Sequence, residues 1–127
     1  MIEQLSDDVI ERLAQQGVQR TFRAGEVLMR LGDWSPSLHI IAEGRVRVVR
    51  SGRGIPHTVA ELGPGDVVGE IGVLSRSART ATVTAIENTR TLELSADAVE
   101  SLVEELPSVR DALLHAFAKR LRESAGD

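Results

Sequence analysis

The sequence predicts a mainly β domain with flanking helices, in which short strands form a compact barrel or sandwich. The apolar periodicity is helical up to about residue 17, close to two from about residue 19 to 95, and helical again from about residue 96. Turn residues recur about every 8–12 residues through the middle part, as in small barrels and sandwiches. The hydrophobic fraction is 42% but aromatics make up only 2%, so the core must be built from aliphatic side chains.

Composition limits the classes of function. A length of 127 residues predicts one domain, 1–127, with a single continuous core. The absence of cysteine removes disulfides, thiolate metal sites and cysteine nucleophiles, and it fits a reducing compartment. A net charge of −4 disfavours direct binding of nucleic acid. The chain has neither a membrane-length apolar run nor the pattern of a signal peptide, so we expect a cytoplasmic protein.

The first predicted element is a helix at about residues 6–17. Ser6 has the side chain of an N-cap, two aspartates follow in the first turn, and Gly17 marks the end. Val9, Leu13 and Ala14 form the predicted buried stripe.

The middle of the chain predicts short strands separated by turns. The clearest predicted hairpin joins Leu38–Ala42 to a strand that contains Val46 and Val48, through a turn at residues 43–44. The segment "IPHTVAEL" adds another strand, and "GPGD" is a Pro-Gly turn. The segments "TATVTAIE" and "TRTLELS" are predicted to form a last pair.

Two helices are predicted after the strands, at about residues 96–124. Ser95 or Asp97 caps the first, and a proline at residue 107 suits the first turn of the second. The apolar face of the second helix is predicted to pack on the barrel. Leu114 and Ala118 lie off that face, which leaves dimerisation through helix 107–124 open.

The segment "GEIGVLSRSARTATVTA", residues 69–85, carries the candidate site. A short helical turn after Gly69 presents backbone amides to an anion. Arg79 has a planar group with five donors that suits two phosphate oxygens, and Thr80 adds a hydroxyl. Glu70 does not belong in a simple anion site, but it fits a ligand that carries a hydroxyl beside its phosphate. One acidic and one basic anchor therefore predict a sugar phosphate or a nucleotide as the ligand.

The motifs "GEIGV" and "RTATV" resemble the phosphate-binding cassette of the cyclic nucleotide-binding domain family. This family includes the catabolite activator protein, the regulatory subunits of cyclic-nucleotide-dependent kinases and cyclic-nucleotide-gated channels. The resemblance extends over nearly the whole chain. It implies an eight-stranded β-roll (a jelly roll, or double-stranded β-helix) at about residues 19–95, between the N-terminal helix and the two C-terminal helices.

The resemblance also implies the ligand and the roles of individual residues. The domain is expected to bind cAMP or cGMP, without a metal, and to regulate an effector that is not in this chain. Glu70 is expected to accept a hydrogen bond from the ribose 2′-OH, and Arg79 to hold the exocyclic phosphate. The other implied ligand contacts lie near the phosphate (Gly69, Ile71, Gly72, Thr80 and Ala81), against the base (Val48, Val59 and Leu62) and on the last helix (Arg120 and Ser124). Arg120 is also expected to pair with Glu70.

Several alternatives stay open at this point. Glu70 and Arg79 could form a purely structural ion pair, in a ligand-free β-roll that serves as an interaction module. Some members that bind cGMP have a threonine at the position of Thr80, but channels that prefer cAMP can have it too. We favour cAMP as the ligand. Arg76 is interpreted as a solvated loop residue, and Trp34 as a rim residue with stacking on the purine as the alternative.

Catalysis is not expected. The three histidines, at residues 39, 57 and 115, are far apart in the sequence, which disfavours the metal cluster of a cupin-like enzyme. No nucleophile elbow is present. The 127 residues include no helix-turn-helix, kinase or channel segment, so we expect either a stand-alone binder or the sensor part of a longer protein.

Overall fold

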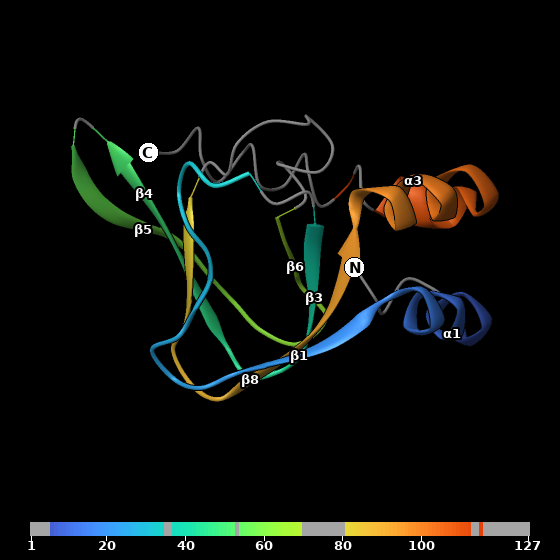
Figure 1. The fold of residues 1–127 in the computed structure, drawn as a ribbon, viewed down its shortest axis with the longest axis horizontal. Helices are drawn as coiled ribbons and strands as arrows, with labels where there is room; N and C mark the ends of the chain where they lie inside the picture. The colour runs from blue at the N-terminus through green and yellow to red at the C-terminus, as the bar shows by residue number, and fades with distance from the viewer. Residues whose placement is uncertain (1–5, 35–36, 53, 70–80, 113–114, 116–127) are drawn as a thin grey trace.

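The computed structural model describes residues 6–34, 37–52, 54–69, 81–112 and 115. Within them, eight strands form two antiparallel sheets, with helices packed at one side (Figure 1). The mainly β class with flanking helices and the eight-stranded β-roll are thereby confirmed, while the extent of the domain, 1–127, stays a prediction. The elements are α1 (Asp7–Gln16), β1 (Val18–Phe22), β2 (Val27–Met29), β3 (Ser37–Glu43), β4 (Val46–Gly52), β5 (Ile55–Leu62), β6 (Val67–Val68), β7 (Thr82–Ala85), β8 (Thr89–Ser95) and α3 (Ala96–Glu105).

The strands alternate between the two sheets along the chain. The first sheet has the order β1-β8-β3-β6, and the second has the order β2-β7-β4-β5. Among the strands that the structure describes, β4 and β5 are the one consecutive pair that shares a sheet. All the remaining strands pair only with strands that do not precede or follow them directly in the sequence.

Two predicted strand pairs are wrong for this reason. The expected hairpin of β3 with β4, and the expected pair of β7 with β8, each join strands of opposite sheets. Both connections are crossovers, and they contact each other. The Ile86 amide donates to the Arg45 carbonyl (2.9 Å), which also accepts from the Thr89 hydroxyl (3.2 Å). Gly44 has φ +94°, and a Cβ built there would lie 2.5 Å from the Asn88 carbonyl oxygen and 2.6 Å from Thr89 Cα.

The local hairpin of the described chain is β4 with β5. It runs from Val46 opposite Leu62 to Gly52 opposite Ile55, with a register shift between Val48 and Val49. Figure 1 shows this hairpin reaching past the other strands, on the side of the molecule away from the helices. It brings one part of the predicted base-binding wall, on β4, beside the other part, on β5.

β3 is covered on both faces, because the helices lie over one face of its sheet and the second sheet over the other. Leu38 and Ile40 pack with the helices, whereas Ile41 packs between the sheets. Residues 37–41 are therefore buried without the alternation of a half-exposed strand. The cluster under the helices contains Leu13, Leu38, Ile40, Val67, Leu94, Ala96, Val99, Leu102, Val109 and Ala112. The cluster between the sheets contains Met29, Ile41, Val46, Val48, Leu62, Val68, Ala81 and Val83.

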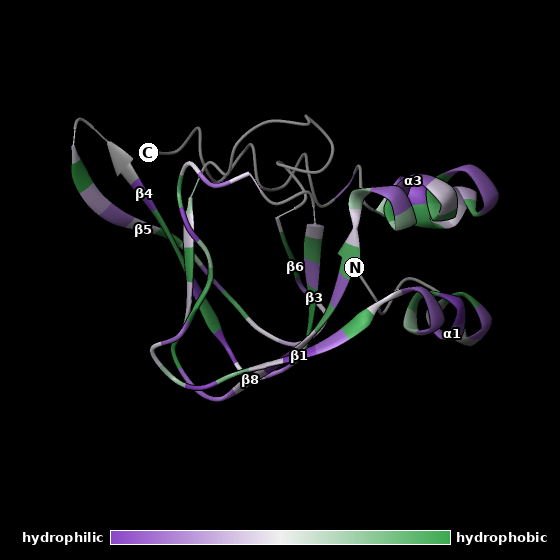
Figure 2. Cartoon of the chain, viewed as in Figure 1, coloured by the Kyte–Doolittle hydropathy of each residue, from purple (hydrophilic) through white to green (hydrophobic). Residues whose placement is uncertain are grey.

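The helices begin where the sequence predicts. The Ser6 hydroxyl accepts a hydrogen bond from the Val9 amide (3.4 Å), and the Ser95 hydroxyl accepts one from the Ala98 amide (3.1 Å), so Ser95 is the cap of α3. Each helix carries apolar residues along part of its surface and hydrophilic residues along the rest (Figure 2).

Leu13 of α1 is buried as predicted, but Ala14 is exposed and does not belong to the buried stripe. Arg12 of α1 forms an ion pair with Glu105 of α3, so the two helices contact each other as well as the sheet. Residues 107–112 are helical, as expected after the proline at residue 107.

We expect Gly44→Ala to destabilise the domain by at least about 2 kcal/mol, because both the positive φ and the overlap with the Asn88 carbonyl oppose a side chain. Gly32→Ala is the matched control, since Gly32 has φ +89° but no atom within 4 Å of the added Cβ. That variant should lose only about 1 kcal/mol. Urea denaturation measures both values, and equal losses would contradict the role of crossover packing.

Candidate functional site

The chain enters the candidate site through the "GPGD" turn. The Asp66 amide donates to the Gly63 carbonyl (3.1 Å), and Gly65 at the third position has φ +88°, which makes this a type II turn with Pro64 at its second position. The Asp66 carboxylate accepts from the Gly63 amide (3.0 Å). Backbone hydrogen bonds of 2.8 and 2.9 Å tie the turn to Ile41 of β3, so the turn is fixed on the first sheet.

Gly69 stands where the predicted cassette begins. It directly follows the two-residue strand β6, which pairs with His39 and Ile40 of β3. Its φ is +90°, a conformation that favours glycine over every other residue. The sequence-based interpretation of Gly69 as a strand-ending glycine is thus confirmed, and its binding role stays a prediction.

Ala81 and Thr82 lie in the C-terminal part of the cassette, at residues 81–85. Ala81 is 8% exposed and packs in the cluster between the sheets. Thr82 begins β7, and its hydroxyl accepts a hydrogen bond from the Leu31 amide (3.0 Å). This bond could not be predicted from the sequence, because no local pattern indicates a partner 51 positions away.

The predicted base contacts come together in the structure. Val48 on β4 and Leu62 on β5 are 6% and 4% exposed in the cluster between the sheets, and Val59 is half-buried and packs against that cluster. Val68, one residue before Gly69, and Ala81 belong to the same cluster. The structure therefore places three predicted base contacts in one apolar group with Val68, which precedes the cassette, and Ala81, in its C-terminal part.

The remaining predicted contacts lie outside the described residues. These are Glu70, Ile71, Gly72, Arg79, Thr80, Arg120 and Ser124, together with Arg76 and most of helix 107–124. Trp34 is described and is 70% exposed, which agrees with a rim position. Its stacking role is not tested.

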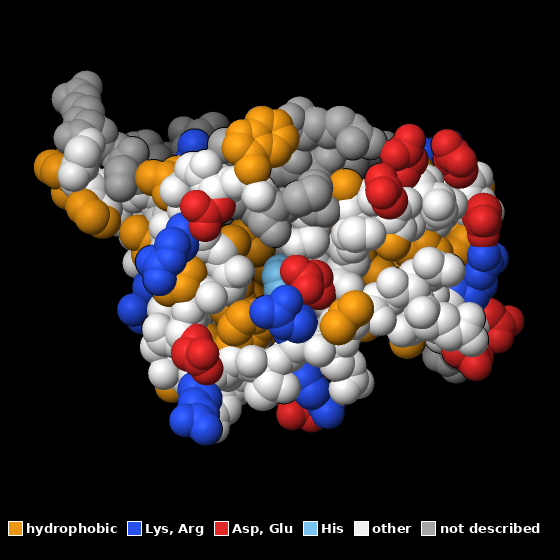
Figure 3. Space-filling view, viewed as in Figure 1, with side chains coloured by type: hydrophobic (Ala, Val, Ile, Leu, Met, Phe, Trp, Pro, Cys, Tyr) orange, Lys and Arg blue, Asp and Glu red, His pale blue; other side chains and the backbone are white. Residues whose placement is uncertain are grey.

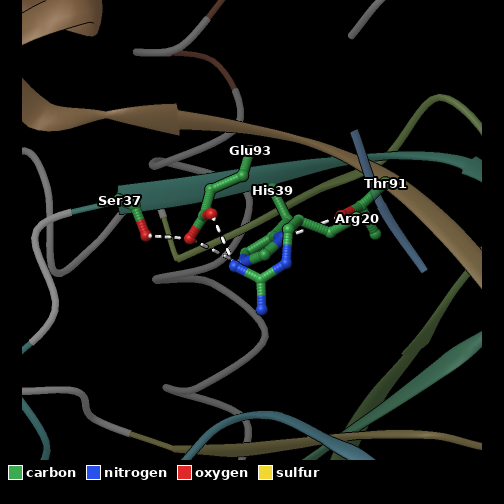
Figure 4. Close-up of polar contacts among 5 residues, drawn as sticks. All are labelled: Arg20, Ser37, His39, Thr91 and Glu93. Atoms are coloured by element: carbon green, nitrogen blue, oxygen red, sulfur yellow. Dashed lines mark hydrogen bonds and ion pairs between the residues drawn. The ribbon is translucent and has the colours of Figure 1, made fainter. Parts of the chain in front are cut away.

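A polar cluster that the sequence analysis missed lies within the first sheet (Figure 4). The buried ring of His39 contacts the Thr91 hydroxyl through Nδ1 (2.8 Å) and lies 3.6 Å from a carboxylate oxygen of Glu93 through Nε2. Glu93 also accepts hydrogen bonds from the Ser37 hydroxyl and from Arg20, both at 2.9 Å. Since these partners come from β1, β3 and β8, the cluster connects three strands, and it contains no predicted ligand contact.

The environment of Glu93 favours its charged form. Burial alone raises the pKa of this carboxyl, but the hydrogen bond from Ser37, the charge of His39 and the contact with Arg20 outweigh burial and lower the pKa below its ordinary value of 4.5. The ionised carboxylate therefore stabilises the folded state.

The described residues offer no second candidate site of clear chemistry. They contain no group of three or more residues that could hold a metal ion, and none of their helices is long and apolar enough to span a membrane. A cavity of about 450 Å³ runs along β2 and is lined by residues 25–30 and 33, none of which is a predicted contact. Acidic side chains gather over α3 (Figure 3), but the expectation that the chain does not bind nucleic acid stays a prediction.

We expect Glu93→Gln to lower the free energy of unfolding at pH 7 by about 1–2 kcal/mol, because the charged hydrogen bonds are lost. The wild-type contribution is complete above pH 4.5 and disappears as the pH falls through the lowered pKa, so the two proteins should converge below that pH. Urea denaturation at pH 7 and at pH 3 measures this. Glu43→Gln, in an exposed ion pair with Arg90, is the control and should change little. A Glu93→Gln deficit that persists at pH 3 would contradict the assignment.

The chain is similar to known proteins in sequence and in fold. The family model described as "Cyclic nucleotide-binding domain" matches residues 19–105. An uncharacterized NTE family protein of Mycobacterium tuberculosis is 31% identical over 125 residues, which are 98% of this chain and 21% of that protein. The cyclic AMP receptor protein of Thermus thermophilus is 35% identical over 107 residues, which are 84% of this chain and 50% of that protein.

Solved structures agree with the family match. The crystal structure of the Thermus thermophilus catabolite activator protein has a TM-score of 0.86 with this chain at 31% identity, covering 95% of this chain and 57% of that one. The chain spans about half the length of these Thermus relatives, and less of the mycobacterial one. Because the family model covers more than half of the sequence and the β-roll agrees with it, the chain belongs to the cyclic nucleotide-binding domain family.

Proposed function

We propose that the chain is a sensor domain that binds cAMP at residues 69–85 and controls an effector outside this chain, without catalysing a reaction itself. The observation that carries this proposal is the common cluster of Val68, Ala81, Val48 and Leu62, in which the residue before the cassette and a residue of its C-terminal part pack with the predicted base wall. A nucleotide needs such a junction of an apolar surface with a polar loop. The similarity to a protein named cyclic AMP receptor protein supports cAMP as the ligand.

Recognition of the phosphate is assigned to Arg79 and to backbone amides. A guanidinium can donate two parallel hydrogen bonds to two phosphate oxygens, which gives both strength and orientation. The amides of Ile71, Gly72 and Ala81 add donors close to the backbone, and Thr80 adds a hydroxyl. Gly69 turns the chain into this loop through its positive φ.

Recognition of the sugar and base is assigned to the other side of the cassette. Glu70 accepts from the ribose 2′-OH, a group that cyclic nucleotides keep free. Val48, Val59 and Leu62 supply an apolar surface for the purine, and Ser124 contacts its edge. Burial of an apolar face stabilises the complex without selecting between adenine and guanine, so the choice of cAMP depends on polar contacts at the rim.

Transmission of the signal is assigned to the C-terminal helix. Val109 and Ala112, near its beginning, are buried in the cluster under the helices together with Leu13 of α1 and Leu102 of α3. A movement of the C-terminal helix would therefore change its packing against both α1 and α3. Arg120, paired with Glu70, is the proposed link between the ligand and that movement, and helix 107–124 is also the candidate surface for a homodimer.

We expect Arg79→Ala to abolish nucleotide-dependent stabilisation. A ligand at about 100 times its Kd stabilises the folded state by about 2.7 kcal/mol, which raises the Tm by several degrees. Thermal unfolding with and without cAMP or cGMP measures this. Arg76→Ala, three positions earlier in the same segment, is the matched control and should keep the full shift, and the larger wild-type shift identifies the preferred purine.

Two other outcomes have distinct meanings. If Arg79→Ala lowers the Tm of the free protein and wild type responds to neither nucleotide at millimolar concentration, the Glu70–Arg79 pair is structural. The chain is then a ligand-free interaction module. If Arg76→Ala loses the shift and Arg79→Ala keeps it, the assignment of the phosphate clamp is wrong.

We expect Arg120→Ala to weaken the response of the C-terminal helix more than it weakens cAMP binding. A ligand shifts a conformational equilibrium only by its different affinities for the two states, and Arg120 is proposed to make that difference. Amide hydrogen exchange over residues 107–112, measured with and without saturating cAMP, reports the response, and calorimetry reports the affinity. A ligand-dependent change in exchange that survives in the variant would contradict this link.

A further inference from the structure

The pairing of β2 with β7, the strand in the C-terminal part of the cassette, is irregular. Val27 lies opposite Thr84 and Met29 opposite Val83, so the register shifts within three residues of β2. The next link toward the cassette is not a pair of backbone groups. It is the hydrogen bond from the Leu31 amide to the Thr82 hydroxyl (3.0 Å).

Thr82 lies between the predicted phosphate contact Arg79 and the rest of β7. It is the first residue of β7 and lies three positions after Arg79. Its backbone is opposite Val49 of β4, so one side of the strand is fixed by regular pairing. On the side of β2, the hydroxyl supplies the connection that the shifted register no longer provides.

We propose that Thr82 is a positioning residue for the cassette, whose hydroxyl fixes the C-terminal part of the cassette against the turn at residues 31–32 and thereby sets nucleotide affinity. This inference rests on the proposed function. A strand end that is bonded on one side only samples more conformations, and a binding loop that must be ordered on binding has a lower affinity than a preorganised one.

The same contact contributes little to global stability. Leu31 is 48% exposed, so its amide can bond to water when the hydroxyl is absent. Thr82 is half-buried, and valine has nearly the same shape without the hydroxyl. Thr82→Val therefore separates positioning of the cassette from stability of the fold.

Thr84→Val is the matched control. Thr84 is in the same strand and half-buried as well, but it is not one of the predicted ligand contacts, and its hydroxyl makes no hydrogen bond with the residues that the structure describes. Thr82→Ser is the conservative variant, because it keeps the hydroxyl. The three variants are compared with the wild-type 127-residue chain by calorimetric titration with cAMP, and by thermal unfolding without a ligand.

We expect Thr82→Val to weaken cAMP binding about 3- to 10-fold, the range that follows from the loss of one hydrogen bond. Thr82→Ser should restore most of the affinity, Thr84→Val should match wild type, and the unliganded Tm values of the two valine variants should agree. The Leu31 amide should exchange faster in Thr82→Val even without a ligand.

Three outcomes would overturn the inference. If Thr82→Val binds cAMP as tightly as Thr84→Val while wild type binds normally, Thr82 does not position the cassette, although the proposed function stands. If its unliganded Tm falls well below that of Thr84→Val, the role is structural. If wild type binds neither cAMP nor cGMP, the proposed function fails, and this inference fails with it.

Discussion

The burial of β3 on both faces is the constraint on which the rest of the structure depends. Leu38 and Ile40 point to one side of the first sheet and Ile41 to the other, and all three are almost completely removed from water. A strand that is apolar on both faces cannot lie at a surface, so it requires a layer on each side. Helices supply one layer and the second sheet supplies the other, and the apolar cluster beside the cassette is a consequence of that second layer.

The same strand carries a polar residue in its interior, and this shows how the constraint is met. His39 is 3% exposed, and a buried imidazole without hydrogen-bond partners is unfavourable. Thr91 and Glu93 on the neighbouring strand provide those partners. The ring of Phe22 packs edge-on against the imidazole, with 5.8 Å between the two ring centroids. The polar cluster therefore allows β3 to be buried at residues 37–41 although one of those residues is a histidine.

Local chemistry made part of this structure predictable. The cap at Ser6 and the "GPGD" turn depend on groups within three residues and were predicted correctly, and Ser95 was one of the two predicted caps of α3. Two strand pairs were predicted wrongly, because both connections cross between the sheets and pack on each other, as at Gly44 and Thr89. The site divides in the same way: the motif identifies candidate residues, whereas the partner of the Thr82 hydroxyl, 51 positions away, has no signature in the sequence.

The chain changes sheets between β6 and β7. β6 ends at Val68 in the first sheet and β7 begins at Thr82 in the second. Val68, Ala81 and Val83 pack together between the sheets, so the spacing of the two layers sets the distance that the chain has to cover from Val68 to Thr82. A substitution in this cluster that alters the spacing of the sheets therefore also alters that distance.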